Sequence, residues 1–267
     1  MRVITHSNVD FDCLLSVYLI QKHFSNQEMQ VVFNSKAKEK DFALECGDIF
    51  VDLSPYATGN DIQVYDHHQK NSQYQSASHN IFVNLLNKNP IYQKLVEEAN
   101  NEDNLLDLKY NGVNIRFYMN YLKETLKDDY KVYEEMKKLF DYVVAFEEKK
   151  LNASRKFNEI GRIEEIKGKK IAIVVGELDS YMSGWIYDEM GVNFIIYKDG
   201  YNMGILRNVN ETFDLNIVKN KMQFENKDKW FCHPQGFILC WGSKKFPAKE
   251  DSGVGVEDLF QLLVSCL

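Results

Sequence analysis

The sequence predicts an α/β protein with an N-terminal domain built on a mainly parallel sheet and a smaller C-terminal α/β domain. Three observations lead to this prediction. Short apolar runs of β-type residues alternate with helical segments in the first half of the chain, which is the pattern of parallel sheets. Polar motifs directly follow several of these runs, where ligands collect in such sheets. A second series of strand-like and helical segments begins near residue 171.

The first half of the chain opens with a strand-like run at Arg2–Thr5 and a helical segment at Asp12–Phe24. Apolar residues recur at helical spacing in that segment, which gives it one buried side. From residue 81 to residue 151 the apolar spacing again favours helices. The other expected elements are strands at Val31–Asn34, Asp48–Asp52 and Ile62–Tyr65, and helices at Tyr92–Ala99, Ile115–Leu126 and Tyr130–Phe146.

We place the N-terminal domain at residues 1–148 and the C-terminal domain at residues 171–267. The segment 149–170 is charged and poor in apolar residues in parts, which is typical of a linker. A chain of 267 residues has room for two domains of about 100–150 residues each. The expected C-terminal elements are strands at Ile171–Val175, Phe194–Tyr197 and Asn202–Arg207, a strand-rich piece at Trp230–Trp241, and helices at Ser180–Glu189 and Val256–Cys266.

The composition excludes several classes of protein. A net charge of −7 and a pI near 5.5 argue against general backbone binding of long nucleic acid, which needs clustered Lys and Arg. The five cysteines form no Cys-x-x-Cys pair, so neither a disulfide framework nor a zinc ribbon is indicated. The sequence contains no leader-like apolar stretch at its start and no run of about 20 apolar residues. We therefore expect a cytoplasmic protein with no membrane partner.

Three separated motifs carry the candidate chemistry. His6-x-x-x-Asp10-x-Asp12 follows the first strand, Asp52 ends the strand Asp48–Asp52, and an Asp-His-His motif follows Ile62–Tyr65. Hard divalent cations such as Mn²⁺ favour carboxylates with some imidazole, and a two-metal site needs a carboxylate that bridges. Neighbouring strands would bring the motifs to one sheet edge. The Asp-His-His motif consists of Asp66, His67 and His68.

Each motif also has an ordinary structural interpretation. Asp12 is a candidate N-cap for the following helix, and Asp52 is a candidate turn residue before Ser54. His67 and His68 could be histidines of a surface loop. The joint occurrence of all three motifs at strand ends favours the metal site over these separate explanations.

Together these motifs resemble those of the DHH phosphoesterases over about the first 110 residues. The first motif of that family is similar to Thr5–Asp12, the second to Val51-Asp52, and the third to Asp66-His67-His68. The resemblance implies that His6 and Asp10 bind one metal, that Asp12 and His67 bind the other, and that Asp52 bridges them. It further implies that Asp66 orients the histidines and that His68 faces the substrate phosphate. It also implies an active site in the cleft between the two domains.

The fourth motif of the family is a single aspartate after a helix. Asp103 follows the helical stretch Tyr92–Ala99 and is the candidate ligand, with Asp107 as its rival. An acidic residue in a loop is more often solvated surface than a ligand, so that interpretation stays open for both.

The C-terminal half departs from the family. Relatives carry a glycine-rich stretch with a histidine and an upstream arginine that contacts substrate, whereas the glycine run is missing here. Arg207, His233 and Gly236 are the nearest equivalents and are our candidate substrate-binding residues. Arg207 could instead form a surface ion pair, and His233 could be a packed loop histidine.

The expected activity is hydrolysis of a phosphoester by two divalent metal ions, Mn²⁺ first, with Mg²⁺ and Co²⁺ as alternatives. The acidic charge favours a small nucleotide-type substrate: a short oligonucleotide, a dinucleotide or a nucleoside bisphosphate. The alternatives are an inorganic pyrophosphatase and a non-catalytic nucleotide sensor on the same fold. The oligomeric state is open, a dimer being one alternative.

Overall fold

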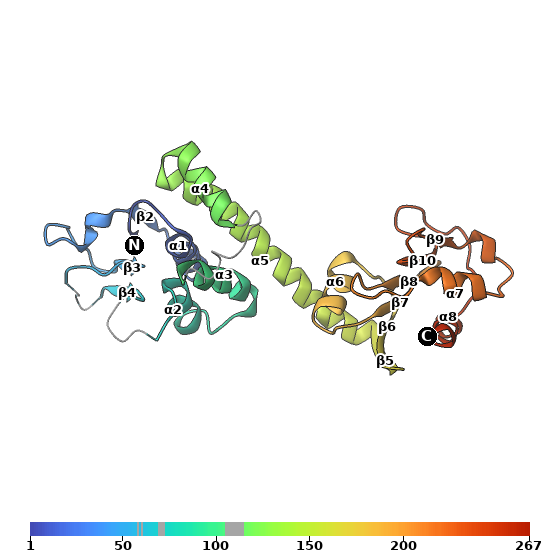
Figure 1. Ribbon diagram of the computed structural model, residues 1–267. Coiled ribbons are helices and arrows are strands. Elements are labelled where there is room, and N and C mark those ends of the chain that lie inside the picture. The colour runs from blue at the N-terminus through green and yellow to red at the C-terminus, as the bar shows by residue number, and fades with distance from the viewer. Residues whose placement is uncertain (58, 60, 69–72, 105–114) are drawn as a thin grey trace. The chain divides into compact units, whose positions relative to one another are not determined.

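The computed structural model describes residues 1–57, 59, 61–68, 73–104 and 115–267 (Figure 1). The chain divides into two compact units, Met1–Glu147 and Glu148–Leu267, and each is described here by itself. The division falls within the long helix α5, which spans Asp129–Ile160.

Sheet A of the N-terminal unit has four parallel strands in the order β2-β1-β3-β4. This arrangement confirms the predicted α/β class and its parallel sheet. The central strands are buried on both faces, as parallel sheets require. The strands are β1 (Arg2–Thr5), β2 (Gln30–Phe33), β3 (Ile49–Val51) and β4 (Gln63–Tyr65).

Helices cover one face of sheet A. Val3, Val31 and Ile49 point into the main core, which the helices complete, and Ile4 and Phe50 point to a smaller cluster on the other face. The helices are α1 (Phe11–His23), α2 (Ala77–Asn84), α3 (Gln93–Asp103), α4 (Ile115–Leu126) and α5, with short 3₁₀ turns at Ser35–Lys38 and Pro90–Tyr92.

Asp10, rather than Asp12, is the N-cap of α1. Its backbone is extended, and its side chain accepts a hydrogen bond from the backbone N–H of Cys13. The helix therefore begins one residue earlier than predicted, and the cap interpretation of Asp12 is wrong.

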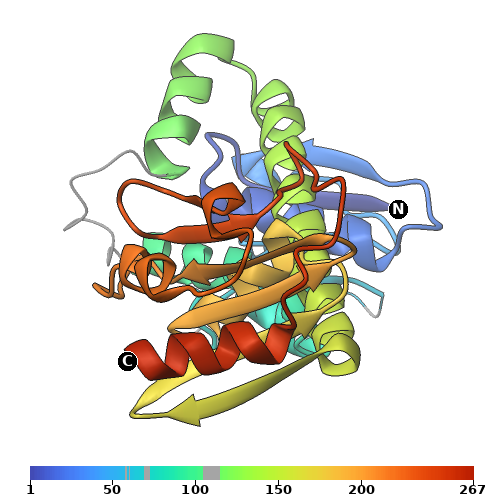
Figure 2. The ribbon, with the colours of Figure 1, turned by 90° about the vertical axis from the view of Figure 1, so that its right-hand side faces the viewer.

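Sheet B of the C-terminal unit is mixed, in the order β5-β6-β7-β8-β10-β9. Helices α7 and α8 pack against one face through residues such as Leu215 and Leu263, whereas α6 and the end of α5 pack against the other. Figure 2 shows α8 in red along this sheet. The elements are β5 (Gly161–Ile166), β6 (Lys169–Val175), α6 (Ser180–Asp188), β7 (Phe194–Asp199), β8 (Asn202–Arg207), α7 (Leu215–Lys221), a 3₁₀ turn (Lys227–Lys229), β9 (Phe231–Cys232), β10 (Ile238–Trp241) and α8 (Val256–Cys266).

The segment 149–170, expected to be a linker, consists of helix and strand in the structure. Its first part completes α5, and its second part forms β5 and the start of β6, which pair as an antiparallel hairpin around Gly168. Ala153 and Phe157 are buried against α6 and sheet B, so this charged stretch carries enough apolar residues at helical spacing to pack there.

Among the described residues, no helix combines the length and apolar character that a bilayer crossing demands.

Candidate metal centre

The carboxyl ends of three neighbouring strands bring the sequence motifs together. Strands β1, β3 and β4 lie side by side and parallel, so the residues that follow them emerge at one edge of sheet A. The first motif follows β1, Asp52 follows β3, and the Asp-His-His motif follows β4. The predicted convergence is therefore present in the structure, whereas the role of each residue stays a prediction.

His6 lies between two carboxylates. Its Nε2 is 3.0 Å from Asp52 Oδ2 and 3.3 Å from Asp10 Oδ2. Burial disfavours the charged imidazole, but the hydrogen bonds to Asp10 and Asp52 outweigh burial and raise the pKa of His6. A protonated His6 thus places a positive charge between the two carboxylates, where a metal ion would otherwise supply it.

Asp12 is the most deeply buried carboxylate of the cluster, with 2% of its surface exposed. Its two oxygens accept hydrogen bonds from the backbone N–H groups of Ala77, at 2.7 Å, and Ser78, at 2.9 Å. Both groups belong to the first turn of α2, where unpaired N–H groups favour an anion. Sequence reasoning missed this support because the helical pattern was recognised only from residue 81, although Ser76 is an N-cap.

His67 lies among three aspartates. Its Nε2 is 2.9 Å from Asp103 Oδ2, and its Nδ1 is 3.4 Å from Asp52 Oδ1 and 3.7 Å from Asp12 Oδ2. Burial works against the charged ring, yet the hydrogen bond to Asp103 and the surrounding negative charge raise the pKa of His67 to about 9.

The structure places Asp103 in the cluster. It is the last residue of α3, so the helix extends four residues beyond the predicted end at Ala99 and carries this carboxylate to His67. Its rival Asp107 lies outside the described residues.

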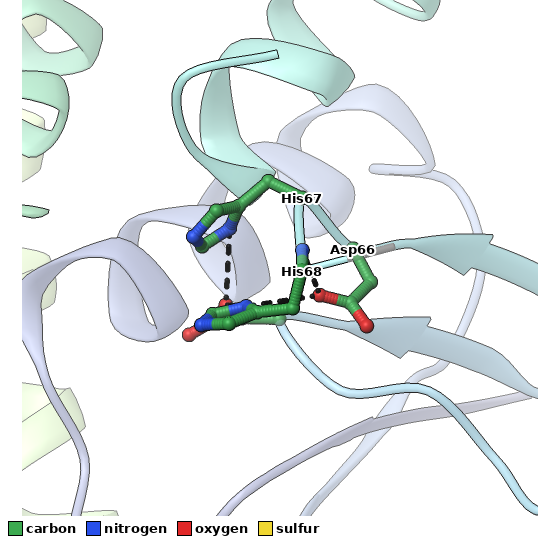
Figure 3. A group of neighbouring side chains, drawn as sticks. Asp66, His67 and His68 are labelled. Carbon is green, nitrogen blue, oxygen red and sulfur yellow. Dashed lines mark hydrogen bonds and ion pairs between the residues drawn. The ribbon is translucent and has the colours of Figure 1, made fainter. Parts of the chain in front are cut away.

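Asp66 holds His68 rather than a member of the buried cluster (Figure 3). Asp66 Oδ1 accepts hydrogen bonds from the backbone N–H of His68 at 3.0 Å and lies 3.2 Å from its Nδ1. Asp66 Oδ2 accepts a 2.5 Å hydrogen bond from the Ser54 hydroxyl. The His68 side chain is 68% exposed. Asp66 therefore holds the ring at Nδ1, while much of the rest of the side chain is open to solvent.

Asp52 touches both histidines of the cluster with different oxygens. Oδ2 faces His6 and Oδ1 faces His67, and the side chain is only 4% exposed. Its backbone has φ of 51°, a left-handed conformation that is uncommon outside glycine and concentrates at functional sites. This turn directly after β3 presents the carboxylate to both sides of the cluster.

The donor set fits divalent cations. Asp52 Oδ1 and His67 Nδ1 are buried, face each other, and have no hydrogen-bond partner among the described residues. Burial and repulsion from Asp52 raise the pKa of Asp12 to about 7, and burial followed by repulsion from Asp10 raises the pKa of Asp52. A buried cluster with surplus negative charge and unpaired oxygen and nitrogen atoms has the chemistry of a site for hard metal ions.

Comparisons with solved structures gave likenesses along nearly the whole chain. The pGpG-specific phosphodiesterase PggH of Vibrio cholerae is 13% identical, with 99% of this chain and 97% of that chain covered and a TM-score of 0.39. A Methanococcus jannaschii protein described as a family II inorganic pyrophosphatase is 14% identical, with 98% and 99% covered and a TM-score of 0.27. RecJ of Thermus thermophilus, in complex with Mn²⁺, is 9% identical, with 100% and 52% covered and a TM-score of 0.33.

These identities and TM-scores are too low to carry an argument about activity. No protein-family model matches the sequence, and the search of curated proteins gave no match. In motif order and geometry, the chain resembles the DHH phosphoesterases.

The three C-terminal candidates of the DHH resemblance lie together at one end of sheet B. The Arg207 backbone N–H donates to the Phe237 carbonyl, and the Gly236 N–H donates to the His233 carbonyl. Arg207 Nη1 donates to the Phe213 carbonyl at 3.0 Å, while its Nε is buried with no partner among the described residues. The ring of His233 lies against Phe237, with the ring centroids 3.9 Å apart.

Gly236 has a structural reason to be glycine. Its φ is 65°, and a Cβ there would lie 1.8 Å from an oxygen of Asp214, the N-cap of α7. Substrate contact by Arg207, His233 and Gly236 stays a prediction.

Proposed function

We propose that this chain is a metal-dependent phosphoesterase that hydrolyses a phosphoester in a small nucleotide-type substrate, using two divalent ions of the manganese type. The observation that carries the proposal is the position of Asp52. One of its oxygens faces the His6–Asp10 pair and the other faces His67, which is the geometry that a bridging carboxylate needs.

The ligands divide into two groups around Asp52. His6 and Asp10 would hold one ion, and Asp12, His67 and Asp103 would hold the other. The N–H groups of α2 keep Asp12 in position while leaving lone pairs on both of its oxygens. When bound, two such ions supply an activated water and offset the charge of the phosphoryl oxygens.

His68 lies beside the buried cluster and is the residue of the site best placed to meet a substrate. Its Nδ1 faces Asp66, which leaves Nε2 for the substrate; with a proton on each ring nitrogen, Nε2 would donate a hydrogen bond to a phosphoryl oxygen or a proton to the leaving oxygen. The contact with Asp66 fixes the ring orientation, and burial of Asp66 is outweighed by hydrogen bonds from Ser54 and His68 that lower the pKa of Asp66. Asp66 is therefore a positioning residue that stays ionised at neutral pH.

The substrate class follows from charge. The net charge of −7 disfavours long nucleic acid, whereas a short anionic substrate can be neutralised locally at the metals. Arg207 and His233 would contact the remainder of such a substrate, since a guanidinium pairs with phosphate through two charge-assisted hydrogen bonds.

A substrate panel tests the proposal. Pyrophosphate, a nucleoside bisphosphate, cyclic and linear dinucleotides, and short RNA and DNA oligomers are each incubated with the purified chain and Mn²⁺. The Asp52→Asn variant, purified in parallel, controls for contaminating phosphatases. We expect turnover of a small nucleotide by the wild type alone.

Other outcomes separate the alternatives. Turnover of pyrophosphate in preference to every nucleotide would make the chain a pyrophosphatase. Nucleotide binding without turnover in the presence of bound Mn²⁺ would make it a sensor and overturn the proposal.

A further inference from the structure

A cysteine lies beside one half of the proposed metal centre. Cys13 is the third residue of α1 and is fully buried, and its Sγ donates to the Asp10 carbonyl at 3.4 Å. The imidazole of His6, a carboxylate oxygen of Asp10 and Cys13 Sγ all lie within 4.8 Å of one another. The motif analysis used His6 and Asp10 but gave Cys13 no role.

The three side chains are held by the same short segment. Asp10 Oδ1 accepts from the Cys13 backbone N–H, and Asp10 Oδ2 faces His6 Nε2. Because Asp10 caps α1, the sulfur lies in the first turn of that helix, close to the Asp10 carboxylate and the His6 imidazole. The geometry therefore presents one nitrogen, one oxygen and one sulfur to a common point.

A second observation indicates that a cation belongs at this point. Asp52 has a side chain that is only 4% exposed, and its Oδ2 lies 3.0 Å from His6 Nε2, the same nitrogen that faces Asp10. The negative charge of Asp52 thus adds to that of Asp10 around this nitrogen.

We propose that Cys13 makes the His6–Asp10 half of the centre a binding site for thiophilic divalent cations such as Zn²⁺ and Cd²⁺, which recruit its sulfur as an additional ligand. This inference rests on the proposed function, because it uses the same metal centre. Soft metals select thiolate, whereas Mn²⁺ selects oxygen and imidazole. The ligand set therefore differs between cations: Mn²⁺ uses His6, Asp10 and Asp52, and Zn²⁺ or Cd²⁺ uses Cys13 as well.

Recruitment of the sulfur is a simple exchange. The Cys13 S–H bond breaks, a sulfur–metal bond forms, and the proton passes to the solvent, with no change in oxidation state. The partly exposed side chains of His6 and Asp10 give the cation its route to the buried sulfur.

Cadmium is the probe, because a sulfur–cadmium bond produces an ultraviolet charge-transfer band. The full chain is freed of metal by dialysis against a chelator and titrated with Cd²⁺. We expect the band in the wild type and in Cys46→Ser, which removes an exposed cysteine that contacts Asp61, and no band in Cys13→Ser. Removal of partners of metal ligands costs about 10–100-fold in affinity, so loss of a direct ligand should weaken Cd²⁺ binding at least about tenfold.

Two further measurements keep the result decisive. Cys13→Ala replaces the buried residue without adding a hydroxyl and serves if Cys13→Ser does not fold. Cadmium NMR of the wild type needs no variant: a sulfur-type resonance should be present and should disappear when excess Mn²⁺ displaces Cd²⁺.

The outcomes distinguish this inference from the proposed function. A band that persists without Cys13, or a wild type that binds Cd²⁺ without a band, overturns the role of Cys13 while Mn²⁺-dependent turnover stands. Failure to bind Mn²⁺ by elemental analysis overturns the proposed function itself.

Discussion

Buried carboxylates of the two units differ in what compensates their charge. In the N-terminal unit, burial raises the pKa of Asp12 and of Asp52, and each carboxylate has another as its neighbour. In the C-terminal unit, Glu211 is 8% exposed, and hydrogen bonds from Lys169 and from two backbone N–H groups outweigh burial and lower its pKa. The chain therefore provides an ammonium group for Glu211, whereas the histidines and N–H groups around Asp12 and Asp52 do not outweigh burial and mutual repulsion.

This difference separates a structural carboxylate from a ligand. A carboxylate whose own chain supplies an ammonium group and N–H donors stabilises the fold when ionised. A group of carboxylates that repel one another costs stability unless a bound cation offsets the charge, and such costs are typical of sites kept for function. The predictions below test whether the two kinds of carboxylate respond in opposite ways.

The largest effect is expected for Asp52→Asn. This variant should abolish turnover while leaving the metal-free fold at least as stable as wild type, because a bridging ligand serves both metals and its removal relieves repulsion. Asparagine also tolerates the left-handed backbone at this position. Turnover is measured with Mn²⁺ and stability by chemical denaturation. Activity within about tenfold of wild type would remove Asp52 from the bridging role.

Asp48 provides the matched control at the other end of β3. It is 1% exposed and forms two contacts with the Arg2 guanidinium, at 2.6 and 2.9 Å. Asp48→Asn should lower the free energy of unfolding by about 1.5–3 kcal/mol, since it removes the buried carboxylate and leaves Arg2 only Glu45 and the Ala43 carbonyl as partners. If Asp48→Asn left stability intact or removed bound metal, the contrast between the two aspartates would be lost.

The next effect is expected for His68→Ala. Turnover should fall by roughly 10²–10⁴-fold, the range for lost acid–base assistance, with the manganese content unchanged. Kinetics at saturating substrate and elemental analysis measure the two quantities. His79→Ala, at a histidine whose ring accepts from the Gln75 N–H, is the control. Loss of manganese from His68→Ala would instead assign His68 to the metal.

A smaller effect is expected for Arg207→Ala. If Arg207 holds a substrate phosphate, KM for a nucleotide should rise about 10–100-fold, equivalent to a charged hydrogen bond of about 1.5–3 kcal/mol. Metal content should not change, and a generic aryl phosphate, which lacks the rest of a nucleotide, should be affected much less. Arg162→Ala, which removes an exposed ion pair with Glu257, is the control. Equal loss on both substrates, with a lower Tm, would make Arg207 structural.

The N-terminal unit could be predicted well from sequence because its determinants are local. The apolar runs predicted the bounds of β1, β3 and β4 to within one or two residues. Because these strands are parallel neighbours, His6, Asp52 and His67 follow them at the same edge of sheet A. Contacts that depend on tertiary packing could not be predicted in this way. The support of Asp12 by the first turn of α2 joins positions 65 residues apart in the sequence, and no local pattern encodes it.

The same limit applies to the boundary between the units. Charged residues at 149–170 suggested a linker, but Ala153 and Phe157, one turn apart, continue α5 and pack on sheet B. The closeness of Cys13 to His6 and Asp10 was also hidden, because Asp10 rather than Asp12 caps α1 and thereby fixes where the sulfur lies.

The smallest effect concerns Glu211 and its pH dependence. Lys169 Nζ lies 2.5 Å from Glu211 Oε2, but the lysine side chain is 36% exposed, so solvent screens the pair. Glu211→Gln should therefore cost about 1–2 kcal/mol at neutral pH, less than loss of a fully buried pair. Because folding lowers the pKa of Glu211, its stabilisation is complete above the ordinary glutamate value of 4.5 and is lost as the pH falls through the folded value. The difference in unfolding free energy between wild type and Glu211→Gln should thus shrink below about pH 4.5.

Glu250→Gln, at an exposed pair with Lys229, should change stability by no more than about 0.5 kcal/mol at either pH. A gap between wild type and Glu211→Gln that widened in acid would mean that the ionised Glu211 does not stabilise the fold, and the contrast with Asp12 and Asp52 would fail from the C-terminal side.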